Sequence, residues 1–186
     1  MQRQLRSDLQ PATVPSREFW GMTPFRFGIP AGWSGRQTTQ HLVYLEYDGD
    51  PTTNCGVEWK RVAPSLSLQR LASMNLAATQ RRFDEVAVGT STFGTINGRK
   101  VYTRVAKLTQ PDPTGDGELA IGQVYTAFFG PIVNEDAPIE LIEITGHFPV
   151  GDSERVDDLE QFTLSFQFNV GVAEAVRDSG DTTEAV

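Results

Sequence analysis

The region from residue 86 to residue 148 constrains the fold most, because apolar segments follow one another there with turn signals between them. Asn97-Gly98 separates the first two segments, and this dipeptide tolerates the positive φ angles of a tight hairpin turn. Loops rich in Pro, Gly, Asn and Asp separate the others. The four segments are Val86–Ile96, Arg99–Leu108, Leu119–Phe129 and Ile139–Phe148. This pattern predicts four consecutive strands of an antiparallel sheet.

Shorter alternating segments before this region predict three further strands. They are Phe25–Ile29, Leu42–Tyr47 and Cys55–Trp59. Met1 to about Arg17 is polar and shows no such alternation, so we expect a flexible arm there.

Two amphipathic segments predict helices. The first, Leu66–Phe83, can be capped by Ser65 or Ser67, and the second, Asp152–Gln167, begins at Asp152 as its N-cap. The side of the first helix expected to pack on the sheet carries Leu68, Leu71, Ala72, Met74, Asn75, Ala78 and Phe83. Strands in series with two segregated helices predict the α+β class, a largely antiparallel sheet flanked by helices.

The length of 186 residues is typical of one domain with a substantial core. We expect that domain over residues 19–169, between a flexible N-terminal arm at 1–18 and an acidic C-terminal tail at 170–186. Both ends have too few periodic apolar residues to offset an ordering cost of about 1–2 kcal/mol per residue.

The net charge of −8 argues against binding to nucleic acid or to an anionic membrane surface. Cys55 is the only cysteine, which excludes an internal disulfide, and the two histidines are too few to complete a Cys/His zinc site. No signal-peptide pattern and no run of about 18 apolar residues is present. These features predict a cytoplasmic protein that is not embedded in a membrane.

Two acidic loops have features of cation sites. Thr53 and Trp59 occupy the sixth and twelfth positions of the first, where a calcium loop needs Gly and Glu, so a hairpin turn is the favoured interpretation. In the second, a polar loop is favoured over a weak cation site. The acidic and polar residues concerned are Asp48, Asp50, Thr52 and Asn54 in the first loop, and Asp112, Asp116 and Glu118 in the second.

Three further groups of residues contain side chains capable of catalysis, and a structural interpretation is favoured for each. Gly32-Trp33-Ser34-Gly35 lacks the nucleophile-elbow pattern, so a turn is favoured. Glu143, Thr145 and His147 share one strand face and could serve acid/base chemistry, but no nucleophile or metal ligand accompanies them, and a structural role is favoured. Cys55 alternates with other core-type residues, which favours a buried thiol. We therefore assign no catalytic, cofactor-binding or metal-ligating residue, expect no cofactor, and leave the partner-binding residues open.

Three motifs resemble the Mog1/PsbP-like superfamily. Residues 25–33, Phe-Arg-Phe-Gly-Ile-Pro-Ala-Gly-Trp, resemble the opening strand of its domain. The turn at Ile96-Asn97-Gly98 and the late Ser165-Phe166-Gln167-Phe168 are similar to family features that follow in the same order. The resemblance covers about residues 25 to 168.

This resemblance implies an α/β/α sandwich and a non-enzymatic role. The bacterial branch includes DcrB-related proteins, LpqN-type lipoproteins and Eag chaperones, and the absence of a lipidated cysteine favours the DcrB-related and Eag-like members. We expect an adaptor or chaperone that binds another protein, such as an effector or a component of a secretion system or contractile particle. Two alternatives stay open: a structural, homo-oligomeric subunit of such an assembly, and a small-ligand-binding or weakly enzymatic domain using the Glu143–His147 face.

Overall fold

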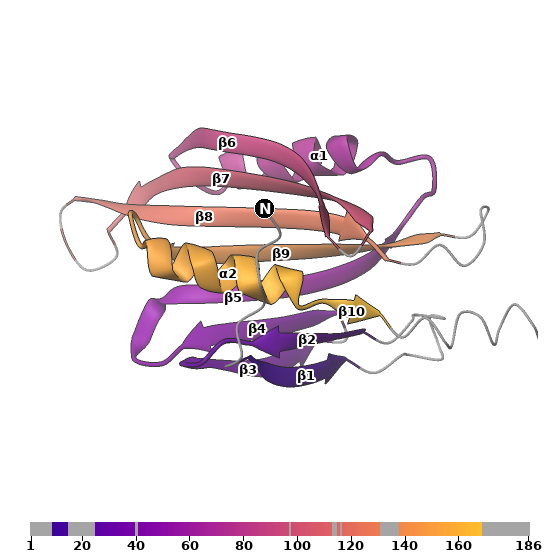
Figure 1. Cartoon of the computed structure of the whole chain (residues 1–186). Coiled ribbons are helices and arrows are strands. Elements are labelled where there is room, and N and C mark those ends of the chain that lie inside the picture. The colour runs from indigo at the N-terminus through magenta and orange to yellow at the C-terminus, as the bar shows by residue number, and fades with distance from the viewer. Residues whose placement is uncertain are drawn as a thin grey trace, which may run out of the picture.

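The computed structural model describes residues 9–14, 25–39, 41–96, 98–112, 115, 117–130 and 138–168. The predicted tail at 170–186 and most of the predicted arm lie outside the described residues, as does Asn97 of the predicted hairpin turn. The described residues form ten strands and two helices (Figure 1). The strands are β1 (Gln10–Val14), β2 (Phe25–Ile29), β3 (Trp33–Thr39), β4 (Leu42–Tyr47), β5 (Asp50–Val62), β6 (Glu85–Ile96), β7 (Arg99–Pro111), β8 (Glu118–Phe129), β9 (Ile139–Pro149) and β10 (Gln167–Phe168). The helices are α1 (Leu68–Gln80) and α2 (Ser153–Leu164).

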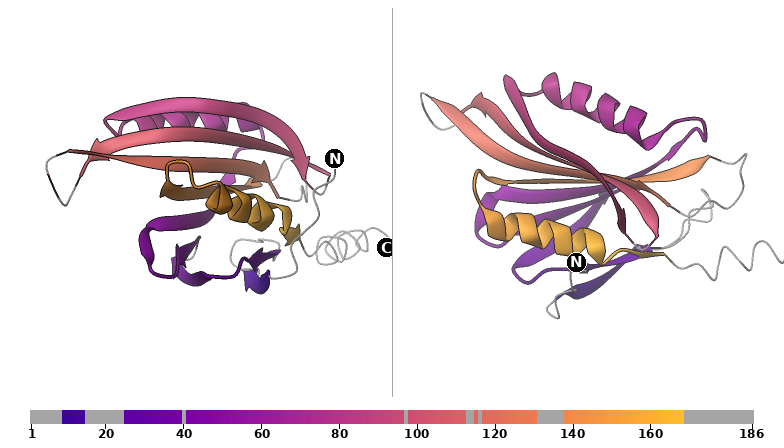
Figure 2. Two further views of the ribbon diagram at one scale, coloured as in Figure 1. Left: turned by 60° about the vertical axis from the view of Figure 1, so that its left-hand side comes forward. Right: turned by 45° about the horizontal axis from the view of Figure 1, so that its top comes forward.

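A seven-stranded antiparallel sheet forms the centre of the domain. Its strand order is β3-β4-β5-β9-β8-β7-β6, and β6 to β9 are the four consecutive strands that the apolar segments predict. Helix α1 lies on one face of this sheet, and α2 lies on the other (Figure 2). The prediction of an α+β fold with a largely antiparallel sheet flanked by helices is confirmed.

The sheet face that carries α2 has the larger core. Phe25 and Phe27 of β2 stack on Phe166, and Phe27 meets Phe162 of α2 edge-on at 4.7 Å between ring centroids. The Oγ of Ser165 accepts a hydrogen bond from the Gly28 backbone N–H at 2.7 Å. Two of the motifs that carry the family resemblance are therefore in direct contact, and together they hold β2 against the end of α2.

A second, smaller core lies under α1. Ser67 caps the helix, because its Oγ accepts a hydrogen bond from the Arg70 N–H at 3.2 Å. The buried side chains of the helix, Leu68, Leu71, Ala72 and Thr79, occupy a narrower stripe than the sequence predicts. Met74 is 53% exposed, so its predicted packing on the sheet is wrong. Among the described residues α1 packs chiefly on β6, β7 and β8, and the flank carrying Met74 faces solvent.

Several element bounds differ from the predictions, and three strands, β1, β3 and β10, were not predicted. Helix α1 ends at Gln80 and α2 at Leu164, each a few residues earlier than expected. Strand β3 replaces a predicted turn after Gly32, and β1 occupies Gln10–Val14 inside the predicted flexible arm. Strands β1 and β3 pair with β2 and β4, and their polar sequences carry no alternation that could announce this pairing. Pro11 is compatible with β1 because β1 is an edge strand.

Candidate functional site

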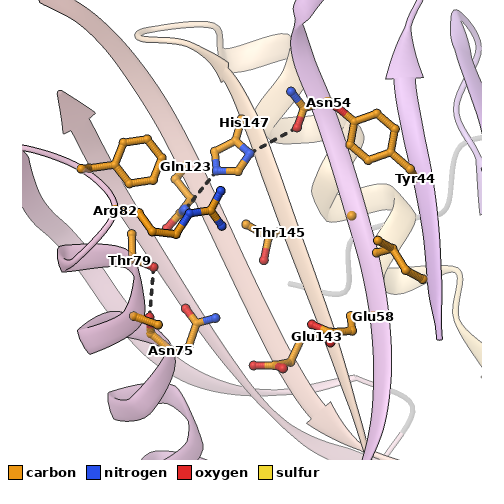
Figure 3. Close-up of a pocket in the computed structure, with 14 residues that line it drawn as sticks. Tyr44, Asn54, Glu58, Asn75, Thr79, Arg82, Gln123, Glu143, Thr145 and His147 are labelled. Carbon is orange, nitrogen blue, oxygen red and sulfur yellow. Dashed lines mark hydrogen bonds between the residues drawn. The ribbon is translucent and has the colours of Figure 1, made fainter. Parts of the chain in front are cut away.

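A pocket of about 430 Å³ opens beside α1, where the helix leaves part of its sheet face uncovered. We call it the α1-side pocket (Figure 3). Strands β4, β5, β8 and β9 form its floor, and the C-terminal half of α1 with the residues that follow forms one wall. Its lining residues are Leu42, Tyr44, Asn54, Gly56, Glu58, Asn75, Ala78, Thr79, Arg82, Phe83, Gln123, Glu143, Thr145 and His147.

Small residues hollow the centre of the floor. Gly56 of β5 lies directly opposite Thr145 of β9 in the strand register. A Cβ atom added at Gly56 would meet only the Cδ1 of Leu42, at 3.5 Å. The absence of a side chain at Gly56 therefore contributes directly to the volume of the pocket.

His147 lies at one end of the pocket within a directional chain of hydrogen bonds. Arg104 Nη2 donates to Gln123 Oε1 at 3.2 Å, and Gln123 Nε2 lies 3.1 Å from His147 Nε2. Because arginine can only donate, the Gln123 atom that faces it is the amide oxygen, and the amide nitrogen of Gln123 donates to His147 Nε2. The proton of the imidazole is therefore on Nδ1. Nδ1 then donates to Asn54 Oδ1 at 3.2 Å. Burial, and secondarily the charge of Arg82, lowers the pKa of His147, which favours this neutral tautomer.

Glu143 lies at the other end of the pocket and is already bound. Its Oε1 accepts a hydrogen bond from the Tyr125 hydroxyl, and its Oε2 pairs with Lys60 Nζ. Burial, followed by the nearby Glu143 carboxylate, raises the pKa of Tyr125, so this phenol remains a hydrogen-bond donor. Glu58, which is exposed, lies beside this pair with its Oε2 4.0 Å from Lys60 Nζ (Figure 3).

Of the predicted candidates, Glu143, Thr145 and His147 share one strand face as expected, and all three line the pocket. Of the four residues predicted in the first acidic loop, Asp48 lies in the turn between β4 and β5, whereas Asp50, Thr52 and Asn54 belong to β5, so the predicted turn is shorter than expected. Asp50 accepts hydrogen bonds from Thr52. Cys55 is fully buried, as predicted, and burial raises the pKa of its thiol. Ser34 is an exposed residue of β3, and Asp116 of the second loop lies outside the described residues. Over the described residues, no cluster of three or more His, Cys, Asp or Glu side chains could hold a metal ion.

Sequence reasoning missed the arginines of this site. Arg104 is buried beneath α1, where its Nη2 also donates to Asn75 Oδ1 at 2.9 Å and its guanidinium lies 4.9 Å from the Tyr125 ring centre. Arg82 follows α1, and its side chain extends over the pocket towards Thr145 (Figure 3). In β7, Arg104 lies on the same strand face as the buried residues Ala106 and Leu108. This inward position was the only signal in the sequence for a buried arginine.

The β6 edge of the sheet is a second candidate site. Nearly the whole of β6 is exposed, and among the described residues β6 pairs only with β7. Beside it, a groove of about 380 Å³ lies between the sheet and α2. We call it the α2-side groove. Its lining residues are Thr92, Gly94, Thr95, Ile96, Val101, Thr103, Val105, Val124, Thr126, Val156, Leu159, Glu160, Thr163 and Leu164.

The described residues form an α+β fold, an antiparallel sheet with one helix on each face (Figure 2). No model of a known protein family matches the sequence, and no curated protein matches it. Among solved structures, the chain is similar to cyanobacterial PsbP (CyanoP) from Synechocystis sp. PCC 6803, with a TM-score of 0.54 and 13% identity over 85% of this chain and 92% of that one. A protein from Bacteroides thetaiotaomicron VPI-5482 has a TM-score of 0.46 and 10% identity over 84% of this chain and 48% of that one. The likeness to CyanoP supports the fold that the sequence resemblance implied. Within the described residues, neither helix is long and apolar enough to cross a membrane.

Proposed function

We propose that this protein is a non-enzymatic adaptor or chaperone that binds an extended segment of a partner protein by adding it as a strand to β6. The observation that carries the proposal is the edge of β6 itself. Residues 86 to 96 contain no charged side chain and no proline, although charges and prolines are the usual protection of an exposed sheet edge. Val88 is 42% exposed and Phe93 is 47% exposed. Such an edge suits pairing with another chain.

The opposite edge of the sheet provides a comparison within the same molecule. Strand β3 has seven residues and carries an exposed arginine, Arg36, whose guanidinium lies 3.7 Å from Glu46. Its register with β4 shifts between Gln37 and Thr39. The register of β6 also shifts, between Val88 and Ser91, so the difference between the two edges is the charge on β3, which discourages edge pairing and makes β6 the better docking strand.

The α2-side groove supplies sites for the side chains of the added segment. The register of β6 with β7 is continuous from Ser91 to Ile96, so a segment of about six residues could pair there. Thr92, Gly94 and Ile96 point to the groove, and its walls include Val105 and Leu159. A partner segment with apolar residues at alternate positions would place them in the groove, while its backbone bonds to β6. The negative charge of this protein favours a neutral or basic partner.

The engagement of the two acid/base candidates supports a non-enzymatic role. Both carboxylate oxygens of Glu143 are bound, and both ring nitrogens of His147 take part in hydrogen bonds. Within the family resemblance we infer a cytoplasmic, DcrB-related or Eag-like protein, with a secretion-system or contractile-particle component as its partner.

The test combines a charge on β6 with hydrogen exchange. Thr92→Lys places a charge at the groove, and Ser34→Lys makes the same kind of change on β3 as a matched control. Affinity purification from native lysate should recover one stoichiometric partner with the unmodified protein and with the control, but not with Thr92→Lys. In the complex, amides 91–96 should gain protection. Equal recovery with both variants, or protection confined to other strands, would refute the proposal.

The same experiment separates the structural-subunit alternative, which the exposed β6 edge also suits. If two copies of this chain pair through β6, the unmodified protein is a dimer in size-exclusion chromatography, and Thr92→Lys is a monomer. That result would replace the adaptor by a self-assembling subunit.

A further inference from the structure

One end of the α1-side pocket is positively charged. The Arg82 guanidinium lies above the floor near His147 (Figure 3), and burial and then the charge of Arg82 lower the pKa of that histidine. Among the described residues no carboxylate forms an ion pair with Arg82 or with the buried Arg104 behind the pocket. The charge of Arg82 therefore acts on this end, and the neutral His147 adds none.

The hydrogen-bond chain also fixes which atoms remain for a ligand at this end. Arg104 donates a hydrogen bond to Asn75 Oδ1 and another to Gln123. Gln123 in turn donates to His147, and His147 donates to Asn54 Oδ1. Since the oxygens of both asparagines are acceptors for these bonds, their Nδ2 groups are the remaining polar atoms, and Nδ2 can only donate. Arg82 and Asn54 line the pocket on the His147 side and offer donors there, whereas Asn75 lies on the Glu143 side (Figure 3). This end suits a carboxylate, which accepts several hydrogen bonds.

The other end is negatively charged. Glu58 and Glu143 lie opposite each other on β5 and β9 there (Figure 3), and among the described residues Lys60 is the cation paired with both. One ammonium group for two carboxylates leaves one net negative charge. Glu58 is exposed and its Oε2 lies 4.0 Å from Lys60 Nζ, so its carboxylate can accept a second cationic donor.

The two ends are separated by the hollow over Gly56. Glu143 and His147 are four residues apart on β9, which is about 13 Å along a strand. The long side chains of Arg82 and Glu58 shorten the gap that a ligand must span. We propose that the α1-side pocket binds a small zwitterion, with its carboxylate at Arg82 near His147, its ammonium group at Glu58 and Glu143, and a chain of several bonds between them. This site is independent of the β6 edge.

Three probes of equal chain length test the charge arrangement by calorimetric titration of the full chain. They are 6-aminohexanoate, hexanoate and hexylamine. We expect 6-aminohexanoate to bind at millimolar concentrations or below, and each single-charge probe to bind at least about tenfold more weakly, because each loses one charge-assisted hydrogen-bonding group. Equal binding of hexanoate and the zwitterion would overturn the assignment of the negative end, and no binding of the zwitterion would overturn the site.

Variants place the binding in the pocket. Gly56→Val fills the floor and should abolish binding of 6-aminohexanoate, whereas Gly94→Val, at a strand glycine outside the pocket with no heavy atom within 4 Å of an added Cβ, should leave it unchanged. Arg82→Gln and Glu58→Gln change exposed side chains, so folding should survive, and each should weaken binding by about tenfold. Unchanged affinity in Gly56→Val that melts like the unmodified protein would overturn the proposal.

Discussion

Gly146 in β9 controls how closely α2 packs on the sheet. A Cβ atom at this position would lie 2.2 Å from Leu159 Cδ1 and 2.8 Å from Leu159 Cδ2. Carbon atoms pack at about 3.5–4.0 Å, so Gly146→Ala requires Leu159 to move by more than about 1 Å. Leu159 is buried in the core between α2 and the sheet, so its side chain has little room to move. Overpacking of this kind costs about 1–3 kcal/mol.

A gain in the unfolded state opposes this cost. Replacing glycine by alanine restricts the unfolded chain and stabilises the fold by about 0.4–1 kcal/mol where the backbone allows it. The midpoints of the two ranges give a net destabilisation of about 1.3 kcal/mol for Gly146→Ala, which lowers Tm by about 3–5 °C in a chain of this size. Gly56→Ala is the matched control on neighbouring β5, because its new Cβ meets one atom at ordinary contact distance. It should raise Tm by about 1–4 °C.

Thermal unfolding followed by circular dichroism measures both variants. Leu159→Ala removes the obstructing δ carbons, so in that background Gly146→Ala should lose its destabilising effect. Equal Tm changes for Gly146→Ala and Gly56→Ala would refute the reasoning. An undiminished effect of Gly146→Ala in the Leu159→Ala background would also refute it, because the strain would then have another source.

Three further predictions concern single side chains. Ser67→Ala should cost about 1 kcal/mol in urea unfolding through loss of the α1 cap, whereas Ser65→Ala should change it by less than about 0.5 kcal/mol, and a larger effect at Ser65 would move the cap. Because the folded pKa of His147 lies below its ordinary 6.5, the unfolded chain binds the extra proton first, so the stability contributed above pH 6.5 should be lost as pH falls below that value. His147→Gln should flatten this pH dependence of the urea midpoint, and an unchanged dependence would contradict the assignment. Buried Cys55, with its raised thiol pKa, should react with Ellman's reagent only as fast as the domain unfolds, and rapid labelling of the native protein would contradict its burial.

The local sequence determined the elements with strong periodicity. Four strands of the β6–β9 region, the strand with Cys55 on its inner face, and both helix caps follow from alternation, turn residues and capping chemistry, because each signal lies within a few consecutive residues. The same alternation places Glu143, Thr145 and His147 on one face, so part of the pocket could be predicted.

Only the tertiary structure decided what meets that face. Arg82 comes from the end of α1 and Arg104 from β7, and their approach to His147 depends on where α1 crosses the sheet. The exposure of Met74 also depends on where α1 crosses the sheet, since the helix packs chiefly on β6, β7 and β8 and leaves this side chain uncovered. Strands β1 and β3 form because neighbouring strands offer backbone partners to polar segments that have no periodicity of their own. Long-range pairing and the placement of a helix depend on contacts between distant residues, and a local pattern does not contain them.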